Sequence, residues 1–315
     1  MKVHILSDSP HSLVKVAKDI YEVLSYHLGE DKVRIHLGYF RPSDVRENCI
    51  IVGCTDFRTW NLYFYIKHYV RGNVIFYITA EGIIPRSWIS KIQYLNNGIV
   101  VTPSHYVASK LREVGIRVDR VIPHGIKYFG EPKKVNNKVF GYIAAYMKRK
   151  YPQYGIEAIK RVSIDFRVIT NNSNPFKHLF NVVAFTYYGL PQKIINDFYQ
   201  QIGWYLNLSD AEGFGLTPLE AMGFGNPVIA PELPVFKEIL PDFTLWVKLT
   251  GERWYEPMIY EDIEHFVYDS NSMVERINQA LTMDNHEYQE LSCKCIEHAK
   301  KFNIYDVYSK FLELI

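Results

Sequence analysis

The alternation of short apolar runs with helix-like segments constrains the fold of this 315-residue chain most strongly. Several of the runs are apolar throughout, which is typical of parallel strands covered on both faces. The runs predict strands at residues 2–6, 33–37, 50–53, 74–79, 99–102, 119–123, 139–145, 166–170, 181–186, 204–209 and 227–230. Helical patterns lie between them, for example at residues 12–28 and 105–115. This alternation predicts a doubly wound α/β architecture.

The length of the chain suits two domains of about 150 residues each. Residues 130–138, GEPKKVNNK, are polar and aperiodic, and predict an interdomain linker. We therefore expect one domain at 1–130 and a second at 131–302, with a closing helix at 303–315 that packs back on the first. Two doubly wound domains would face a central cleft and place ligands at the carboxyl ends of their strands.

Composition excludes several classes of protein. The formal net charge is +2, from 36 basic and 34 acidic side chains, which argues against a dedicated nucleic-acid binder.

No apolar run approaches the ~20 residues of a membrane span, and the chain begins directly with a strand-like segment, so we expect a cytoplasmic protein without a signal peptide. The aromatic segment 59–70 predicts a core helix or, alternatively, weak contact with a membrane surface. No CxxC pair occurs among the cysteines, which we expect to be reduced packing residues: Cys49, Cys54, Cys293 and Cys295.

Residues 210–228, DAEGFGLTPLEAMGFGNPV, carry two glutamates in a short glycine-rich stretch. Thr217 is a good helix N-cap, Pro218 suits the first helical position, and Glu220 stands three residues after the cap. This spacing predicts a capping box, which explains Glu220 without any ligand.

The capping box does not explain Glu212 or the glycines. Gly213 and Gly215 permit positive φ and a close approach of the backbone to a ligand, and N–H groups before a helix N-terminus favour a phosphate. A carboxylate such as Glu212 repels phosphate but hydrogen-bonds sugar hydroxyls. The stretch therefore predicts a ligand that is part diphosphate and part polyol, as a nucleotide-sugar is. A dinucleotide fingerprint is disfavoured because Pro218 replaces its third glycine, and a purely structural turn and helix is the alternative.

At these residues the chain resembles a known family. EGFGLTPLEAMGFGNPVIA, at 212–230, closely resembles the E-x7-E signature of retaining GT-B glycosyltransferases of family 4. Residues 120–126, 140–162 and 298–315 also resemble segments of that family. The resemblance implies two Rossmann-like domains and transfer of a hexose from a nucleotide-diphosphate sugar to an acceptor hydroxyl, with retained configuration and without a metal.

The resemblance also implies roles for individual residues. Glu220 would hydrogen-bond the ribose hydroxyls of the nucleotide, and Glu212 would bind hydroxyls of the transferred sugar. Backbone amides near Glu212 would help to hold sugar and phosphate, which makes donor-binding candidates of Gly213, Phe214, Gly215, Leu216 and Thr217.

The family carries an arginine and a lysine that neutralise the departing diphosphate. Lys150 matches the lysine, whereas Ala145 stands at the arginine position. Lys148 or Arg149 would then supply the missing positive charge. The alternative is that residues 148–150 form a solvated loop.

In the N-terminal domain two loops would face the cleft. Ser9, His11 and Ser12 are expected acceptor-side contacts, although His11 also suits a helix start. Glu81 stands where many relatives place a histidine, and would bind a sugar hydroxyl or act as a base toward the acceptor. The acceptor itself would be a glycan, a lipid or a protein. His105 and His124 are expected to be structural.

No Asp-x-Asp pair and no His/Cys cluster with metal spacing occurs in a plausible loop, so we expect neither a metal nor a cofactor beyond the donor. Two alternatives to a glycosyltransferase stay open. One is another GT-B activity, namely a sugar phosphorylase or a nucleotide-sugar epimerase. The other is a catalytically silent protein that binds a nucleotide-sugar.

Overall fold

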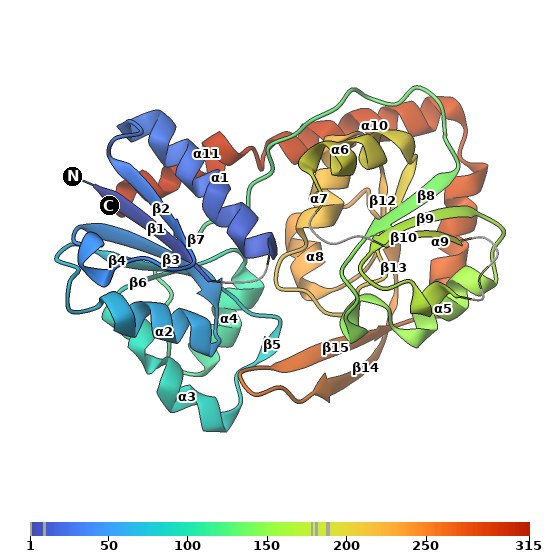
Figure 1. The fold of residues 1–315 in the computed structure, drawn as a ribbon. Helices are drawn as coiled ribbons and strands as arrows, with labels where there is room; N and C mark the ends of the chain where they lie inside the picture. Colours follow the sequence, from blue (N-terminus) through green and yellow to red (C-terminus); the bar gives the residue numbers. More distant parts are fainter. Residues whose placement is uncertain (1, 9–10, 178, 180–181, 187–189) are drawn as a thin grey trace. The chain divides into compact units, whose positions relative to one another are not determined.

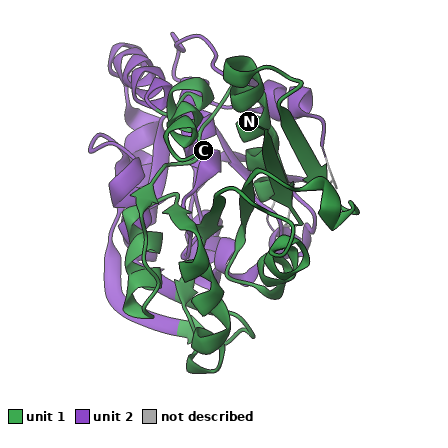
Figure 2. Ribbon diagram, turned by 90° about the vertical axis from the view of Figure 1, so that its left-hand side faces the viewer, with its two compact units in different colours: residues 1–127, 255–264, 302–315 green, residues 128–254, 265–301 purple. Residues whose placement is uncertain are grey.

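A computed structural model describes residues 2–8, 11–177, 179, 182–186 and 190–315. The chain forms two compact units, which Figures 1 and 2 show. Unit 1 comprises Met1–Lys127, Tyr255–Glu264 and Phe302–Ile315. Unit 2 comprises Tyr128–Trp254 and His265–Lys301.

Unit 1 is built on a six-stranded parallel sheet in the order β2-β1-β3-β4-β6-β7. Its strands are β1 (Val3–Ser7), β2 (Val33–Leu37), β3 (Asn48–Cys54), β4 (Val74–Thr79), β6 (Ile99–Thr102) and β7 (Arg120–Val121). Its helices are α1 (His11–Leu28), α2 (Phe57–Ile66), α3 (Arg86–Ile92), α4 (His105–Glu113) and α11 (Ile304–Tyr308). Every residue of β1 is buried, as the continuous apolar pattern of a central parallel strand requires.

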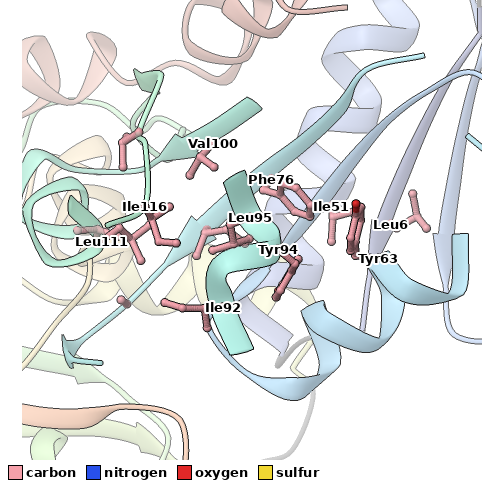
Figure 3. Packing of buried hydrophobic residues seen from close by; sticks show 14 of the residues in the cluster. Leu6, Ile51, Tyr63, Phe76, Ile92, Tyr94, Leu95, Val100, Leu111 and Ile116 are labelled. Atoms are coloured by element: carbon pink, nitrogen blue, oxygen red, sulfur yellow. The ribbon is translucent and has the colours of Figure 1, made fainter. Parts of the chain in front are cut away.

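Aromatic rings pack among the aliphatic side chains of a core cluster in unit 1 (Figure 3). Tyr63 of α2 lies 5.3 Å from Phe76 of β4 and 5.4 Å from Tyr94, measured between ring centroids. Phe76 and Tyr94 are 5.6 Å apart in an edge-to-face arrangement, which such rings prefer. The apolar face of α2 is therefore a core face, as one of the two interpretations of segment 59–70 predicted.

Unit 2 repeats this architecture with a parallel sheet in the order β10-β9-β8-β11-β12-β13. Its strands are β8 (Val139–Ile143), β9 (Asp165–Thr170), β10 (Val182–Thr186), β11 (Trp204–Leu206), β12 (Val228–Pro231) and β13 (Leu245–Val247). Its helices are α5 (Gln153–Lys160), α6 (Gln192–Gln201), α7 (Leu216–Gly223), α8 (Pro234–Ile239), α9 (Ser270–Thr282) and α10 (Asn285–Lys300). The prediction of two doubly wound Rossmann-like domains is confirmed.

A small third sheet, ordered β14-β15-β5, was not predicted. It consists of β14 (Leu249–Glu256), β15 (Asp262–Tyr268) and the two-residue β5 (Gly82–Ile83). Most of β14 is exposed, so it lacks the apolar run by which the other strands are recognised. The chain passes from unit 2 to unit 1 within β14 and returns within β15.

Segment 130–138, predicted to be a linker, is fixed to unit 2. The Lys133 ammonium donates to the carbonyl oxygens of Tyr199, Gln200 and Ile202 at 3.1, 2.7 and 2.6 Å, at the C-terminus of α6. The Asn136 amide donates to the carbonyl oxygens of Ala280 and Met283. The segment is therefore part of a folded unit and not a free connection.

The unit boundaries differ from the predicted ranges. The first change of unit follows Lys127, and residues 255–264 group with unit 1 although they lie within the range predicted for the second domain. Residues 302–315 also group with unit 1, and the Tyr308 hydroxyl of α11 accepts a hydrogen bond from Gly125 N at 2.9 Å. In the described part of the chain, no helix has both the length and the hydropathy needed to cross a bilayer.

Candidate functional site

The turn between β11 and α7 ends at Gly215, the N-cap of α7. Gly215 has φ +99°, and an added Cβ would lie 2.4 Å from the Phe236 ring, so glycine is required there. The helix begins at Leu216, so the prediction that Thr217 caps it was wrong. Pro218 consequently lies at the third helical position, where its missing N–H has no intrahelical acceptor to lose.

Glu220 is therefore not part of a capping box. It lies further inside α7, is half-buried, and accepts a hydrogen bond from the Tyr199 hydroxyl at 3.1 Å. Burial, followed by the charge of Glu220, raises the pKa of Tyr199 well above its usual value. A phenol that stays protonated keeps donating to Glu220, so this contact orients the carboxylate.

Glu212 lies in the same turn with 7% of its surface exposed. Its carboxylate contacts the Lys150 ammonium, and its other oxygen lies 3.6 Å from Nη1 of Arg149. Burial alone would raise the pKa of Glu212, but the charges of Lys150 and Arg149 and hydrogen bonds from Lys150 and Ser209 hold it below its usual value. Glu212 is thus held in its ionised form although it is buried.

The basic residues come from a single 3-10 turn at Lys148–Lys150, which follows β8. The Tyr142 hydroxyl donates to the Lys150 carbonyl oxygen at 3.0 Å, and Asp210 N donates to the Arg149 carbonyl oxygen at 2.9 Å. Arg149 is 8% exposed and Nη1 donates to the Ala211 carbonyl oxygen at 3.3 Å. A buried, tethered arginine is not the solvated loop that the alternative interpretation proposed. The turn holds two cations beside Glu212.

Sequence reasoning missed a second buried cluster beside this site. Asp210 accepts hydrogen bonds from the Tyr154 hydroxyl and from Nδ1 of His265, the latter at 2.7 Å. Asp210 and His265 are both fully buried. The His265 ring stacks on Trp254 at 3.6 Å, and the Lys148 ammonium lies 4.5 Å above that indole ring. Asp210 stands two residues before Glu212, but nothing local identifies a partner 55 residues later.

The remaining predicted donor residues lie along this turn and the start of α7. Phe214 is 3% exposed, so its side chain belongs to the core and only its backbone is available to a ligand. Leu216 and Thr217 are half-buried in the first turn of α7, and Gly213 is buried. N–H groups at a helix N-terminus favour an anion, so this part of the turn suits a phosphate.

The residues predicted for the acceptor side lie in unit 1. Ser9 is outside the described residues, His11 is the first residue of α1, and Ser12 is exposed. Glu81 follows β4, and its backbone N–H donates to the Glu261 carboxylate.

Two histidines were expected to be structural. His105 begins α4, and Nδ1 of His124 lies 2.8 Å from the Tyr77 hydroxyl in the interior of unit 1. Within the described ranges, no three His, Cys, Asp or Glu residues are grouped so that they could hold a metal ion.

Comparison with known proteins adds independent findings about this chain. Residues 137–249, which contain Lys150, Glu212 and Glu220, match the model of the family Glycosyl transferases group 1. The chain is 26% identical to the uncharacterized glycosyltransferase 335 of Sulfolobus islandicus rod-shaped virus 1, over 99% of this chain and 100% of that protein. It is 24% identical to the putative glycosyltransferase ORF313 of Acidianus filamentous virus 1, over 76% of this chain and 73% of that protein.

Two solved structures resemble this protein along nearly the whole chain. The Anabaena protein HepE in complex with UDP and glucose superposes with a TM-score of 0.73 at 13% identity, covering 99% of both chains. A sucrose-phosphate synthase from Thermosynechococcus elongatus has a TM-score of 0.73 at 12% identity, covering 100% of this chain and 98% of the other. The chain therefore has the GT-B fold of two Rossmann-like α/β domains, and its residues 137–249 match glycosyl transferases of group 1.

Proposed function

We propose that this protein is a glycosyltransferase of the family 4, E-x7-E type that moves a hexose from a nucleotide-diphosphate sugar to an acceptor hydroxyl. The observation that carries the proposal is the pairing of Glu212 with Lys150 and Arg149 beside the start of α7. An ionised carboxylate suits sugar hydroxyls, whereas the two cations and the helix N-terminus suit a diphosphate. A nucleotide-sugar presents both kinds of group within one molecule.

The same arrangement suits the chemistry of transfer. The bond between the anomeric carbon and the diphosphate oxygen breaks, a bond forms from that carbon to the acceptor oxygen, and the acceptor hydroxyl proton passes to the Glu81 carboxylate. Negative charge then grows on the departing diphosphate, where Lys150, Arg149 and the amides of the Gly215–Thr217 turn stabilise it. Because hydrogen bonds from Tyr142 and Asp210 fix the backbone of the turn that carries Lys150 and Arg149, that turn needs little reorganisation during the reaction.

Glu220 binds the ribose hydroxyls in this proposal. It is half-buried, the Tyr199 hydroxyl holds its carboxylate, and it lies on α7, whose first turn binds the phosphate. Lys148 adds positive charge from its place above Trp254. In unit 1 we keep Ser12 and Glu81 as acceptor-side candidates, with Glu81 as a base toward the acceptor. We propose transfer with retained configuration and without a metal, since fixed cations already supply the charge that a metal would contribute.

A thermal-melting screen against UDP-, GDP-, ADP- and dTDP-sugars tests donor binding, because a ligand at 100 times its Kd stabilises the fold by about 2.7 kcal/mol. Product analysis with and without an acceptor then identifies the reaction, and NMR of the new anomeric centre reports its configuration. Chelator treatment should leave the rate unchanged. Donor binding without turnover on any acceptor would favour a silent binding protein, and acceptor-independent conversion of the sugar would favour an epimerase.

A further inference from the structure

Unit 1 contains a pocket of about 360 Å³ that the proposed donor site does not use. Its lining residues follow three neighbouring strands: Asp8 comes directly after β1, Tyr39 and Phe40 come after β2, and Arg58 and Asn61 lie on α2 after β3. The volume falls within the roughly 300–1,000 Å³ of small-molecule sites.

The position of this pocket in the topology of unit 1 is informative. In the sheet order β2-β1-β3, the chain runs from β1 to β2 on one side of β1 and then crosses to β3 on the other side. This is a topological switch point, and in open α/β sheets ligands bind at such a point, outside the carboxyl ends of the strands. The pocket therefore lies where the fold itself creates a ligand crevice.

Aromatic rings form part of the pocket wall. The buried Phe40 ring packs edge-on against Tyr65 at 5.7 Å, and the Tyr65 hydroxyl donates to the Phe40 carbonyl oxygen at 3.3 Å. Tyr39, next in the wall, leaves 93% of its surface exposed. A single exposed tyrosine is ordinary on a protein surface. Tyr39, however, lines the same pocket as Phe40 and Tyr65, so its ring adds an apolar face to that pocket.

Polar groups complete the wall. Asp8 and Asn61 are exposed, and Nε of Arg58 lies 3.8 Å from the Asp56 carboxylate while 41% of the arginine side chain stays exposed. A pyranose ring has one face of C–H groups and a rim of hydroxyls, which this mixture of rings, amide, carboxylate and guanidinium matches. An acyl chain would offer these polar groups no hydrogen bonds, and the Asp8 carboxylate disfavours a phosphate.

We propose that this pocket binds a sugar ring of the acceptor, so that the acceptor is a carbohydrate. The role of the bound sugar as acceptor rests on the proposed function, whereas sugar binding in the pocket does not. Tyr39 supplies the stacking face, and Asn61, Asp8 and Arg58 hydrogen-bond the hydroxyls. Ser12 and Glu81 do not line this pocket, so it adds residues to those that sequence analysis assigned to the acceptor.

Saturation-transfer NMR on the full chain tests the proposal with an equimolar mixture of the methyl α-glycosides of glucose, galactose, mannose and N-acetylglucosamine. Ring protons of at least one glycoside should receive saturation. Tyr39→Ala should lower that affinity about tenfold, and Asn61→Ala should also weaken it. Tyr69→Ala is the matched control, because Tyr69 is 45% exposed and does not line the pocket.

The absence of saturation in every glycoside, or equal saturation with Tyr39→Ala, would overturn the inference. In a second experiment the protein is centrifuged with phosphatidylcholine vesicles. If the protein sediments with the vesicles in a Tyr39-dependent way and binds no glycoside, the inference is also overturned. The melting screen with nucleotide-sugars separates this failure from that of the proposed function. Donor binding without glycoside binding would refute the pocket alone. Glycoside binding at Tyr39 without donor binding or transfer would refute the proposed function and leave a carbohydrate site.

Discussion

Asp210 accepts a hydrogen bond from Nδ1 of His265 at 2.7 Å, and neither residue has any exposed surface. The backbone of Asp210 is held as well, since its N–H donates to the Arg149 carbonyl oxygen and its carbonyl oxygen accepts from Phe266 N, both at 2.9 Å. One residue thus joins the basic turn, β15 and the turn that carries Glu212. We infer that this contact positions Glu212 without touching a ligand.

Asp210→Ala should therefore destabilise the protein by about 3–5 kcal/mol, because it leaves buried partners of a polar pair without their acceptor. Chemical denaturation measures this loss. Asp284→Ala is the control, since it removes an exposed N-cap of α10 and should cost only about 1 kcal/mol. Equal losses in the two variants would show that the buried contact is not important for stability.

Lys150→Met should lower kcat about 100-fold or more, because it removes a cation that the leaving diphosphate requires and leaves Glu212 with Arg149 alone. Lys148→Met is the matched control: its ammonium lies above Trp254 and is exposed, so a smaller loss is expected. The measurement is steady-state transfer with the donor found in the melting screen. A Lys150 variant with wild-type kcat would contradict the assignment.

Glu220→Gln should raise the donor KM with little change in melting temperature. Because α7 begins at Leu216 and Gly215 is its N-cap, the substitution removes no helix cap. Gln still accepts from the Tyr199 hydroxyl but loses the charge that strengthens hydrogen bonds to the ribose. An unchanged donor KM would exclude the ribose role, and a large fall in melting temperature would indicate a structural one.

Gly215→Ala should destabilise the protein more than Gly251→Ala does. Both glycines have positive φ, +99° and +90°, so each substitution costs about 1–2 kcal/mol of backbone strain. Only at Gly215 does the new Cβ meet a neighbour, the Phe236 ring at 2.4 Å, which adds about 1–3 kcal/mol for overpacking. Denaturant midpoints of the two variants give the comparison, and equal midpoints would show that Phe236 moves aside freely.

His124 should make stability fall as the pH drops from about 6.5. Burial, followed by the charge of Lys15, lowers the pKa of His124 from 6.5 to about 3, so the unfolded chain takes up a proton before the folded one does. The loss should reach about 2 kcal/mol at pH 5. Melting at pH 7.5 and pH 5 should show a smaller pH effect in His124→Gln. His286→Gln, whose side chain is 86% exposed, should behave like the wild type, and an identical pH effect in all three proteins would refute the prediction.

The sequence by itself determined the two parallel sheets. Strands such as Val3–Ser7 and Val74–Thr79 are buried on both faces, so their apolar runs are visible without knowledge of any partner. The turn at 212–217 was also recognisable, because glycines next to a glutamate and a helix start have a local chemical meaning. The sequence pattern does not predict β14, because its residues are mostly exposed and the strand depends on pairing with a neighbour.

Only the tertiary structure decided how this turn is built and held. The capping box at Thr217 fits local propensity, but in the structure the N-cap is Gly215, two residues earlier, with positive φ and in close approach to Phe236, and the helix begins at Leu216. His265 lies 55 residues from its partner Asp210, and Lys150 lies 62 residues from its partner Glu212, with Arg149 next to Lys150. A buried carboxylate requires such partners, but its own sequence neighbourhood does not reveal which residues they are, because folding alone brings them together.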